Sequence, residues 1–116
     1  MAKTLGPYTP AVRAGDFIFV SGQLGMADGA LVEGGVAGQA AQSVRNLAAR
    51  LDELGASLTD IVKTTCFLID MDAFATFNEA YIAGFGDHRP ARSTIAVREL
   101  PNGGEVEIEA VAYKPL

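Results

Sequence analysis

The sequence predicts a two-layer α+β domain in which two helices pack on one face of a mixed β-sheet. Apolar and polar residues alternate with period two near both ends of the chain, as they do in strands. Two longer segments carry apolar residues at the three- and four-residue spacing of helices. The resulting order is strand, strand, helix, strand, helix, strand, strand. A strand-helix-strand connection favours parallel pairing and the terminal hairpins add antiparallel pairs, so the sheet should be mixed, with its second face uncovered.

The composition indicates one domain over residues 1–116, with 49% hydrophobic and 20% charged residues. The longest apolar runs are about five residues, far short of a membrane span, so no membrane partner is expected. The N-terminal residues contain no apolar segment of signal-peptide length. The one cysteine, Cys66, cannot form an internal disulfide and is interpreted as a small buried hydrophobe. These features fit a cytoplasmic location.

Two short strands are predicted over residues 8–13 and 16–22, with a hairpin turn at Ala14–Gly15. Residues 17–20 are apolar on both sides, which predicts a strand that is covered on both faces. The glycines at 22, 25 and 29 resemble a phosphate-binding loop only superficially. No helix opens directly after them, so nucleotide binding is not expected.

The first helix is predicted over residues 36–54 and should end at Gly55. Residues 57–60 resemble a one-turn capping segment, and residues 61–69 are rich in β-branched residues, which predicts a strand. The second helix should begin at Asp70 or Asp72 and run to about residue 85. Its packing stripe is predicted to consist of Phe74, Phe77, Tyr81 and Phe85.

The last two predicted strands, residues 90–97 and 106–112, carry two charges among apolar neighbours, Arg92 and Glu107. Charges on a strand ordinarily mark its solvated face, but a buried unpaired charge is costly and needs a partner or a function. If the two strands form a direct hairpin, the two residues lie roughly 20 Å apart. If the strand at 61–69 lies between them, the two strands are roughly 10 Å apart. Neither arrangement makes an ion pair within one subunit.

The reactive side chains are few. The single histidine, His88, has no second imidazole or cysteine pair for a metal site, and it is interpreted as a solvated loop residue. No Gly-x-Ser-x-Gly motif is present, and Cys66 has no base nearby in sequence. The remaining carboxylate, guanidinium, hydroxyl and amide groups suit a reaction that needs no cofactor, an anionic substrate and a positioned water.

Nucleic-acid binding is not expected. The net charge is −5, and the nine lysines and arginines are scattered along the chain. Affinity for nucleic acids depends mainly on neutralising phosphates, and no basic patch is evident.

Several motifs together resemble the Rid/YjgF family of enamine and imine deaminases, also labelled the endoribonuclease L-PSP family. The C-terminal string Pro-Ala-Arg-Ser-Thr at 90–94 is followed by Leu-Pro at 100–101 and Val-Glu-Ile-Glu-Ala at 106–110. Matching pieces precede it in family order: residues 6–8, 19–23, 61–65 and 74–78. The resemblance therefore covers essentially the whole chain.

The resemblance implies a homotrimer of chorismate-mutase-like subunits with clefts between them. It implies hydrolysis of short 2-imino and enamine acids to 2-oxo acids and ammonia, with Arg92 holding the substrate carboxylate and Glu107 acting on the water. The pocket-lining residues that it implies are Tyr8, Ser21, Gly22, Asn78 and Thr94. Tyr8 and Asn78 could equally be a packed aromatic and a helix-surface amide. Thr94 stands where the best-known deaminases often have cysteine, and the segment 86–89 is shorter than theirs, so the substrate range stays open.

Other functions remain as alternatives. The chain could be a non-catalytic small-molecule binder or a holdase-like protein that keeps the family fold. Some family members have been described as ribonucleases or translation inhibitors, which the acidic charge disfavours here. Because both Arg92 and Glu107 are present, the deaminase hypothesis is preferred.

Overall fold

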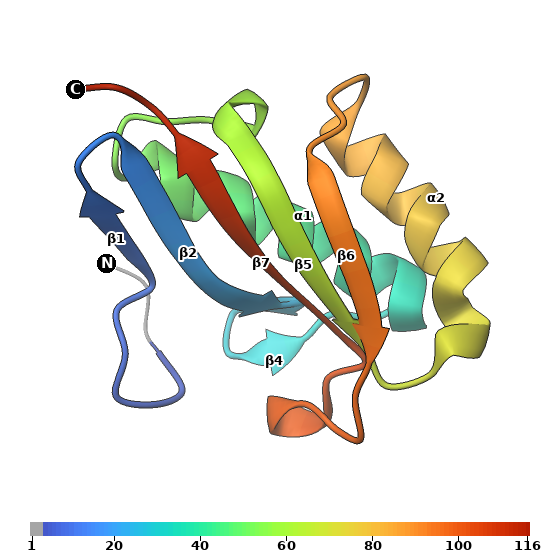
Figure 1. Ribbon diagram of the computed structural model, residues 1–116. Coiled ribbons are helices and arrows are strands. Elements are labelled where there is room, and N and C mark those ends of the chain that lie inside the picture. The colour runs from blue at the N-terminus through green and yellow to red at the C-terminus, as the bar shows by residue number, and fades with distance from the viewer. Residues whose placement is uncertain (1–3) are drawn as a thin grey trace.

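The computed structural model describes residues 4–116, so the first three residues of the expected domain range lie outside the described part (Figure 1). The strands are β1 (Ala11–Ala14), β2 (Phe17–Leu24), β3 (Met26–Ala27), β4 (Ala30–Leu31), β5 (Ile61–Leu68), β6 (Ala91–Ala96) and β7 (Val106–Tyr113). The α-helices are α1 (Gly35–Asp52) and α2 (Phe74–Phe85), and short 3₁₀ turns cover Leu58–Asp60, Met71–Ala73 and Pro101–Gly103. Neither α-helix combines the length and apolarity that crossing a membrane requires in the described residues.

The main sheet has five strands in the order β1-β2-β7-β5-β6. Strands β5 and β6 pair in parallel, and the other neighbours pair antiparallel, which confirms the predicted mixed sheet. Because β5 lies between β6 and β7, the last two strands do not form a direct hairpin. The small hairpin of β3 and β4 was not predicted; it follows directly after β2.

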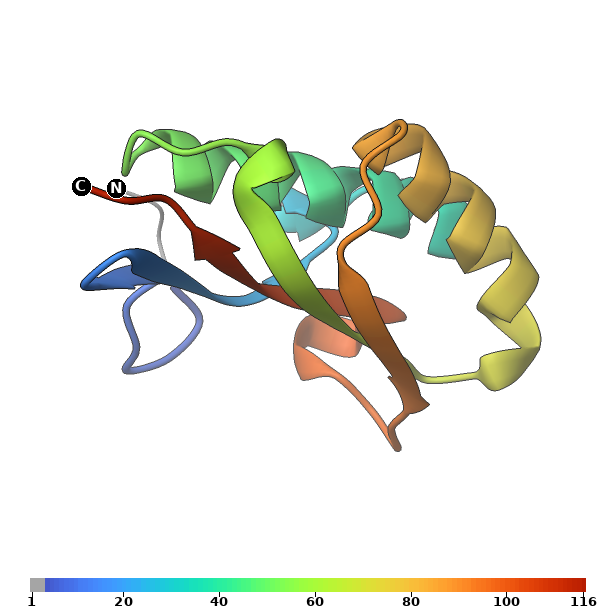
Figure 2. The same ribbon diagram turned by 45° about the horizontal axis from the view of Figure 1, so that its top comes forward.

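Both α-helices cover the same face of the sheet, as predicted, and the opposite face has no α-helix over it (Figure 2). The core lies between the two layers. Its largest fully buried apolar side chains come from both of them: Ile18, Leu47, Leu51, Ile61, Leu68, Phe77 and Ile108. The strands contribute alternate residues to this core, which is the physical reason for the period-two pattern.

The ends of the helices follow from local chemistry. Helix α1 ends at Asp52, two residues earlier than predicted, and Leu54 is 36% exposed beyond it. Gly55 takes φ 78°, a conformation that favours glycine, and Ala56 N–H donates to the Leu51 carbonyl across that turn. The predicted capping segment is confirmed, since Ser57 and Asp60 form a reciprocal capping box.

Helix α2 is preceded by a 3₁₀ turn that Asp70 caps by accepting a hydrogen bond from the Asp72 N–H. The predicted packing stripe is confirmed for Phe77, Tyr81 and Phe85, which are buried. The prediction was wrong for Phe74, which is 38% exposed at the first turn of the helix.

One end of the uncovered sheet face is apolar. Phe17 and Phe19 are 42% and 48% exposed, so the prediction that residues 17–20 are covered on both faces is wrong for a single chain. Ile18 and Val20 between them are buried. Ile95 and Tyr113 add exposed apolar area on the same face, where the Phe17 and Tyr113 rings meet edge to face at 5.2 Å. Between these rings and Ile95 the same face carries the polar residues Thr65, Ser93 and Glu109. The exposed aromatic cluster typically marks an interaction site.

Candidate functional site

The residues singled out in the sequence form two separate groups. Arg92 belongs to the first. It lies on the edge strand β6 in register with Thr64 of β5, which is fully buried against the helices, so Arg92 projects toward the helix layer. Its guanidinium carbon lies 4.9 Å from the ring centroid of Tyr81, 5.5 Å from that of Phe74 and 5.7 Å from that of Phe77. These separations are within the range of cation–π attraction.

The guanidinium of Arg92 is not neutralised by a carboxylate. Among residues 4–116 the ion pair that forms is Arg50–Glu53, and Arg92 takes part in none. Aromatic faces therefore hold the cation in place of an acid. Its N–H donors stay available to an anion from outside the chain.

Two buried polar atoms belong with Arg92. Thr94 lies two residues further along β6, on the same face of the sheet, and Asn78 lies one turn beyond Phe74 on α2. Thr94 Oγ1 and Asn78 Oδ1 are both buried without a hydrogen-bond partner among the described residues. Unpaired buried polar atoms are uncommon, so a pair of them near an unpaired cation is a suitable place for a polar ligand. We call Asn78, Arg92 and Thr94 the arginine group.

Glu107 lies on the other face of the sheet. It is in register with Leu24 of β2 and Phe67 of β5. A Cβ atom added at Gly22 would lie 2.7 Å from Glu107 Cδ, so the glycine leaves room for this carboxylate. Tyr8, Ser21, Gly22 and Glu107 line one cavity of about 840 Å³. We call these four residues the glutamate group.

Burial raises the pKa of Glu107 above its ordinary value, and the charge of Glu109 two residues along the strand raises it further. A carboxyl with a raised pKa is a better proton acceptor at neutral pH than an ordinary one, provided that it remains ionised. In the same cavity, the Ser21 hydroxyl donates to the Thr9 carbonyl at 2.8 Å and fixes the segment that leads to Tyr8.

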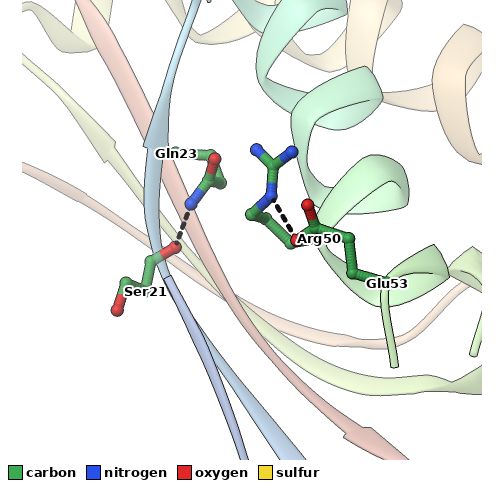
Figure 3. A network of polar contacts seen from close by, with 4 residues as sticks. All are labelled: Ser21, Gln23, Arg50 and Glu53. Atoms are coloured by element: carbon green, nitrogen blue, oxygen red, sulfur yellow. Dashed lines mark hydrogen bonds and ion pairs between the residues drawn. The ribbon is translucent and has the colours of Figure 1, made fainter. Parts of the chain in front are cut away.

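The helix side of the cavity contains polar residues that sequence reasoning missed: Gln23 and Arg50. Arg50 reaches from α1 toward β2, and its Nε donates to Glu53 Oε1 at 3.1 Å (Figure 3). Gln23 Nε2 donates to the Ser21 carbonyl at 3.0 Å. In the sequence Arg50 is an ordinary polar position of an amphipathic helix. Only the packing of α1 against β2 brings it to the cavity.

The other reactive candidates lie elsewhere. His88 lies in a loop, as predicted, but it is half-buried rather than fully solvated, and its Nε2 is 2.8 Å from the Ile61 carbonyl. Cys66 is fully buried as predicted, and burial raises its pKa to about 11, which makes its thiol unreactive. Between residues 4 and 116 no three histidine, cysteine or acidic side chains come together as metal ligands would.

Comparison with known proteins supports one family throughout. The family model described as Endoribonuclease L-PSP matches residues 1–114. The human 2-iminobutanoate/2-iminopropanoate deaminase is 44% identical over 112 residues, which cover 95% of this chain and 82% of the human protein. A RutC family protein of Pyrococcus abyssi is 43% identical over 114 residues, which cover 97% of this chain and 90% of the relative.

A solved structure shares the fold at similar identity. RidA from the Antarctic bacterium Psychrobacter sp. PAMC 21119 superposes with a TM-score of 0.91 at 39% identity, covering 96% of this chain and 91% of that one. The strand order, the two helices on one face and the family motifs thus agree with the sequence match. The chain belongs to the Rid/YjgF family.

Proposed function

We propose that the protein hydrolyses short 2-imino and enamine acids to 2-oxo acids and ammonia. The proposal rests on the surroundings of the Arg92 guanidinium and the Glu107 carboxyl group. Arg92 is an oriented guanidinium without an acidic partner, and Glu107 is a half-buried carboxyl with a raised pKa beside a cavity. The relatives named as 2-iminobutanoate/2-iminopropanoate deaminases support the same chemistry.

The reaction adds one water and releases one ammonia. Arg92 holds the substrate carboxylate through two parallel hydrogen bonds, which fixes the imine carbon. Glu107 accepts a proton from water as the oxygen attacks that carbon and the C=N bond becomes a C–N single bond. Glu107 passes that proton to the nitrogen, which gives a carbinolamine. It then accepts the proton of the carbinolamine hydroxyl and delivers it to the nitrogen, so that the C–N bond breaks, ammonia leaves and the C=O bond of the 2-oxo acid forms. An enamine enters after tautomerising to the imine. Each positioned acid-base step contributes about 10²–10⁴-fold.

The two groups act on one substrate only if they come from different chains. They lie on opposite faces of the sheet. Arg92 is on β6 and Glu107 is on β7, and β5 lies between these two strands. We propose that the chain forms a homotrimer through its uncovered face, which carries Phe17, Phe19 and Tyr113, with the arginine group of one subunit facing the glutamate group of the next. Sedimentation should show a trimer for the wild type, and Phe19→Ser should shift it toward smaller species, because Phe19 lies on that face. A stable wild-type monomer at micromolar concentration would overturn this assembly.

The central experiment measures ammonia and 2-oxo acid release from imines generated in situ by an amino-acid oxidase. Arg92→Ala should lose most of kcat/KM, and Arg92→Lys should recover little because a point charge replaces a two-pronged fork. Glu107→Gln should still bind a 2-oxo acid but turn over about 10²–10⁴-fold more slowly. Arg98→Ala serves as the matched control, since Arg98 is exposed and follows β6.

Two results would contradict the proposed deaminase function. One is a wild-type rate no faster than buffer, and the other is full activity in Arg92→Ala. In either case the alternative function, a non-catalytic small-molecule binder or a holdase-like protein, would be preferred.

A further inference from the structure

We propose that Arg50 binds a second carboxylate at the far end of the substrate, so that 2-imino dicarboxylic acids are the favoured substrate class. The proposal rests on the proposed function and extends it. The unused hydrogen-bond donors of Arg50, its partial burial and its place in the lining of the same cavity as Glu107 support it.

Arg50 is the single basic residue among the described residues that line the cavity. The acidic ones are Asp28 and Glu107. The side chain of Arg50 is 16% exposed, so its charge is partly withdrawn from solvent. A partly desolvated cation attracts an anion more strongly than a fully exposed one. The cavity therefore has a guanidinium at Arg50 that pairs with Glu53 through its Nε only and is a different group from the carboxylate of Glu107.

The guanidinium of Arg50 uses one of its three nitrogens within the described chain. Its Nε donates to Glu53 Oε1 at 3.1 Å, and neither Nη atom makes a hydrogen bond among residues 4–116. The bond to Glu53, whose side chain is 41% exposed, restrains the guanidinium at the rim. The two Nη atoms form the end of the planar fork that matches a carboxylate. Figure 3 shows this end directed away from Glu53.

The neighbouring polar side chains are already engaged. Asn46 Nδ2 donates to the carbonyls of Leu24 and Met26, both at 2.9 Å. Gln23 Nε2 donates to the Ser21 carbonyl. These bonds hold the walls of the cavity without satisfying Arg50. An anion that enters from the Ser21 side finds unused donors at Arg50.

In the single chain the cavity extends from Glu107 to Arg50, both of which line it. Its volume is about 840 Å³, and pockets of about 300–1,000 Å³ accommodate drug-sized ligands. A longer substrate whose chain carries a second carboxylate uses that space. The 2-carboxylate binds at Arg92 of the neighbouring subunit, the imine carbon lies by Glu107, and the distal carboxylate binds at Arg50.

The test compares two imines made in situ by an oxidase, one from glutamate and one from 2-aminobutanoate. We expect Arg50→Gln to lower the ratio of kcat/KM for the dicarboxylic over the monocarboxylic imine by about 10- to 100-fold, mainly through KM, as the loss of a charge-assisted hydrogen bond does. Arg50→Lys should restore part of the ratio. Arg45→Gln is the matched control, because Arg45 is an exposed arginine of the same helix that lies outside the cavity and bonds to Gln42.

A binding measurement provides a readout that needs no turnover. Titration calorimetry should show that 2-oxoglutarate binds the wild type more tightly than 2-oxobutanoate, and that Arg50→Gln removes the difference. If Arg50→Gln leaves both the kcat/KM ratio of the two imines and the relative affinities of the two 2-oxo acids unchanged, the assignment of Arg50 is wrong. The proposed deaminase function is not affected by that result. If no imine is hydrolysed but the binding difference depends on Arg50, the proposed function fails while the carboxylate site remains. If the binding difference is absent as well, both fail.

Discussion

The guanidinium of Arg92 and the carboxylate of Glu107 lie on opposite faces of the same sheet. Arg92 is in register with buried Thr64 and faces the helices, whereas Glu107 is in register with Phe67, which lies on the uncovered face. Alternation along paired strands fixes this relationship, because a one-residue slip would move every core residue to the wrong side. A single chain cannot apply both groups to one small substrate from these positions.

Two inactive variants should therefore complement each other. When Arg92→Ala and Glu107→Gln chains are expressed together, each mixed trimer should contain one cleft with an intact arginine group from one chain and an intact glutamate group from another. Activity should return to a fraction of the wild-type level in the co-expressed sample. Wild-type chains mixed with the double variant test whether dilution alone explains the result. The same activity in separately purified and co-expressed samples would contradict a site shared between subunits.

The aromatic residues around Arg92 should tune substrate binding. Phe74 is the suitable residue to change, because it is 38% exposed and 5.5 Å from the guanidinium. Phe74→Leu should weaken 2-oxo acid binding about two- to five-fold, the effect of losing about 0.5–1 kcal/mol of cation–π attraction. Phe74→Tyr should preserve binding. Ile82→Ala, at another exposed position of α2, controls for general effects on the helix. Equal binding by Phe74→Leu and the wild type would show that the rings do not orient Arg92.

Gly22 should matter for activity rather than for stability. In Gly22→Ala, the new Cβ would meet the end of the Glu107 side chain, 2.7 Å from Cδ and 3.0 Å from Oε1. The carboxylate can rotate away, so the fold should survive while kcat falls. In Gly25→Ala, the new Cβ would instead collide with the backbone of Gln39, which cannot rotate away, and thermal denaturation should show a clear loss of stability. A Gly22→Ala protein with normal kcat would place the reacting water away from Glu107.

Much of the fold could be predicted from local pattern. The three-four spacing gave both helices, Gly55 and the Ser57–Asp60 segment marked the end of α1 and the entry to β5, and the element order indicated a mixed sheet. The position of β5 between β6 and β7 stayed open, because strand neighbours depend on long-range packing that period-two alternation does not encode. The exposure of Phe17 and Phe19 was mispredicted for a related reason. A run that is apolar on both sides shows that both faces require a partner, but not whether the chain itself supplies it.

The site was less accessible to sequence reasoning. Motif resemblance named Arg92 and Glu107, but their separation on two faces follows from register, which the motifs do not contain. The aromatic stripe was interpreted as core, and Tyr81 is indeed buried, yet the same ring also supports the guanidinium of Arg92 at 4.9 Å. Arg50 had no distinguishing signal, because one arginine on a solvated helix face resembles any other.

The raised pKa of Glu107 should be visible both in stability and in activity. Burial is its main cause and Glu109 the second, while the register partners Leu24 and Phe67 carry no charge. A carboxyl whose pKa is higher in the folded than in the unfolded chain stabilises the fold while it is protonated. That contribution is complete below the unfolded pKa, about 4.3, and is lost as the pH rises through the folded value. Glu107→Gln, which cannot ionise, should therefore have a higher Tm than the wild type at pH 7, and the difference should shrink toward pH 4.

The same shift places the acid limb of the kcat/KM profile above the ordinary pKa of a glutamate, because the reaction needs the ionised form of Glu107 to accept a proton. Glu109→Gln removes the repelling charge, which lowers the pKa of Glu107 and should move the acid limb to lower pH. Glu99→Gln, an exposed change outside β7, should leave the limb in place. The measurement is kcat/KM for one imine over a series of pH values, in the wild type and in both variants. An acid limb that stays fixed in Glu109→Gln would mean that another group accepts the proton.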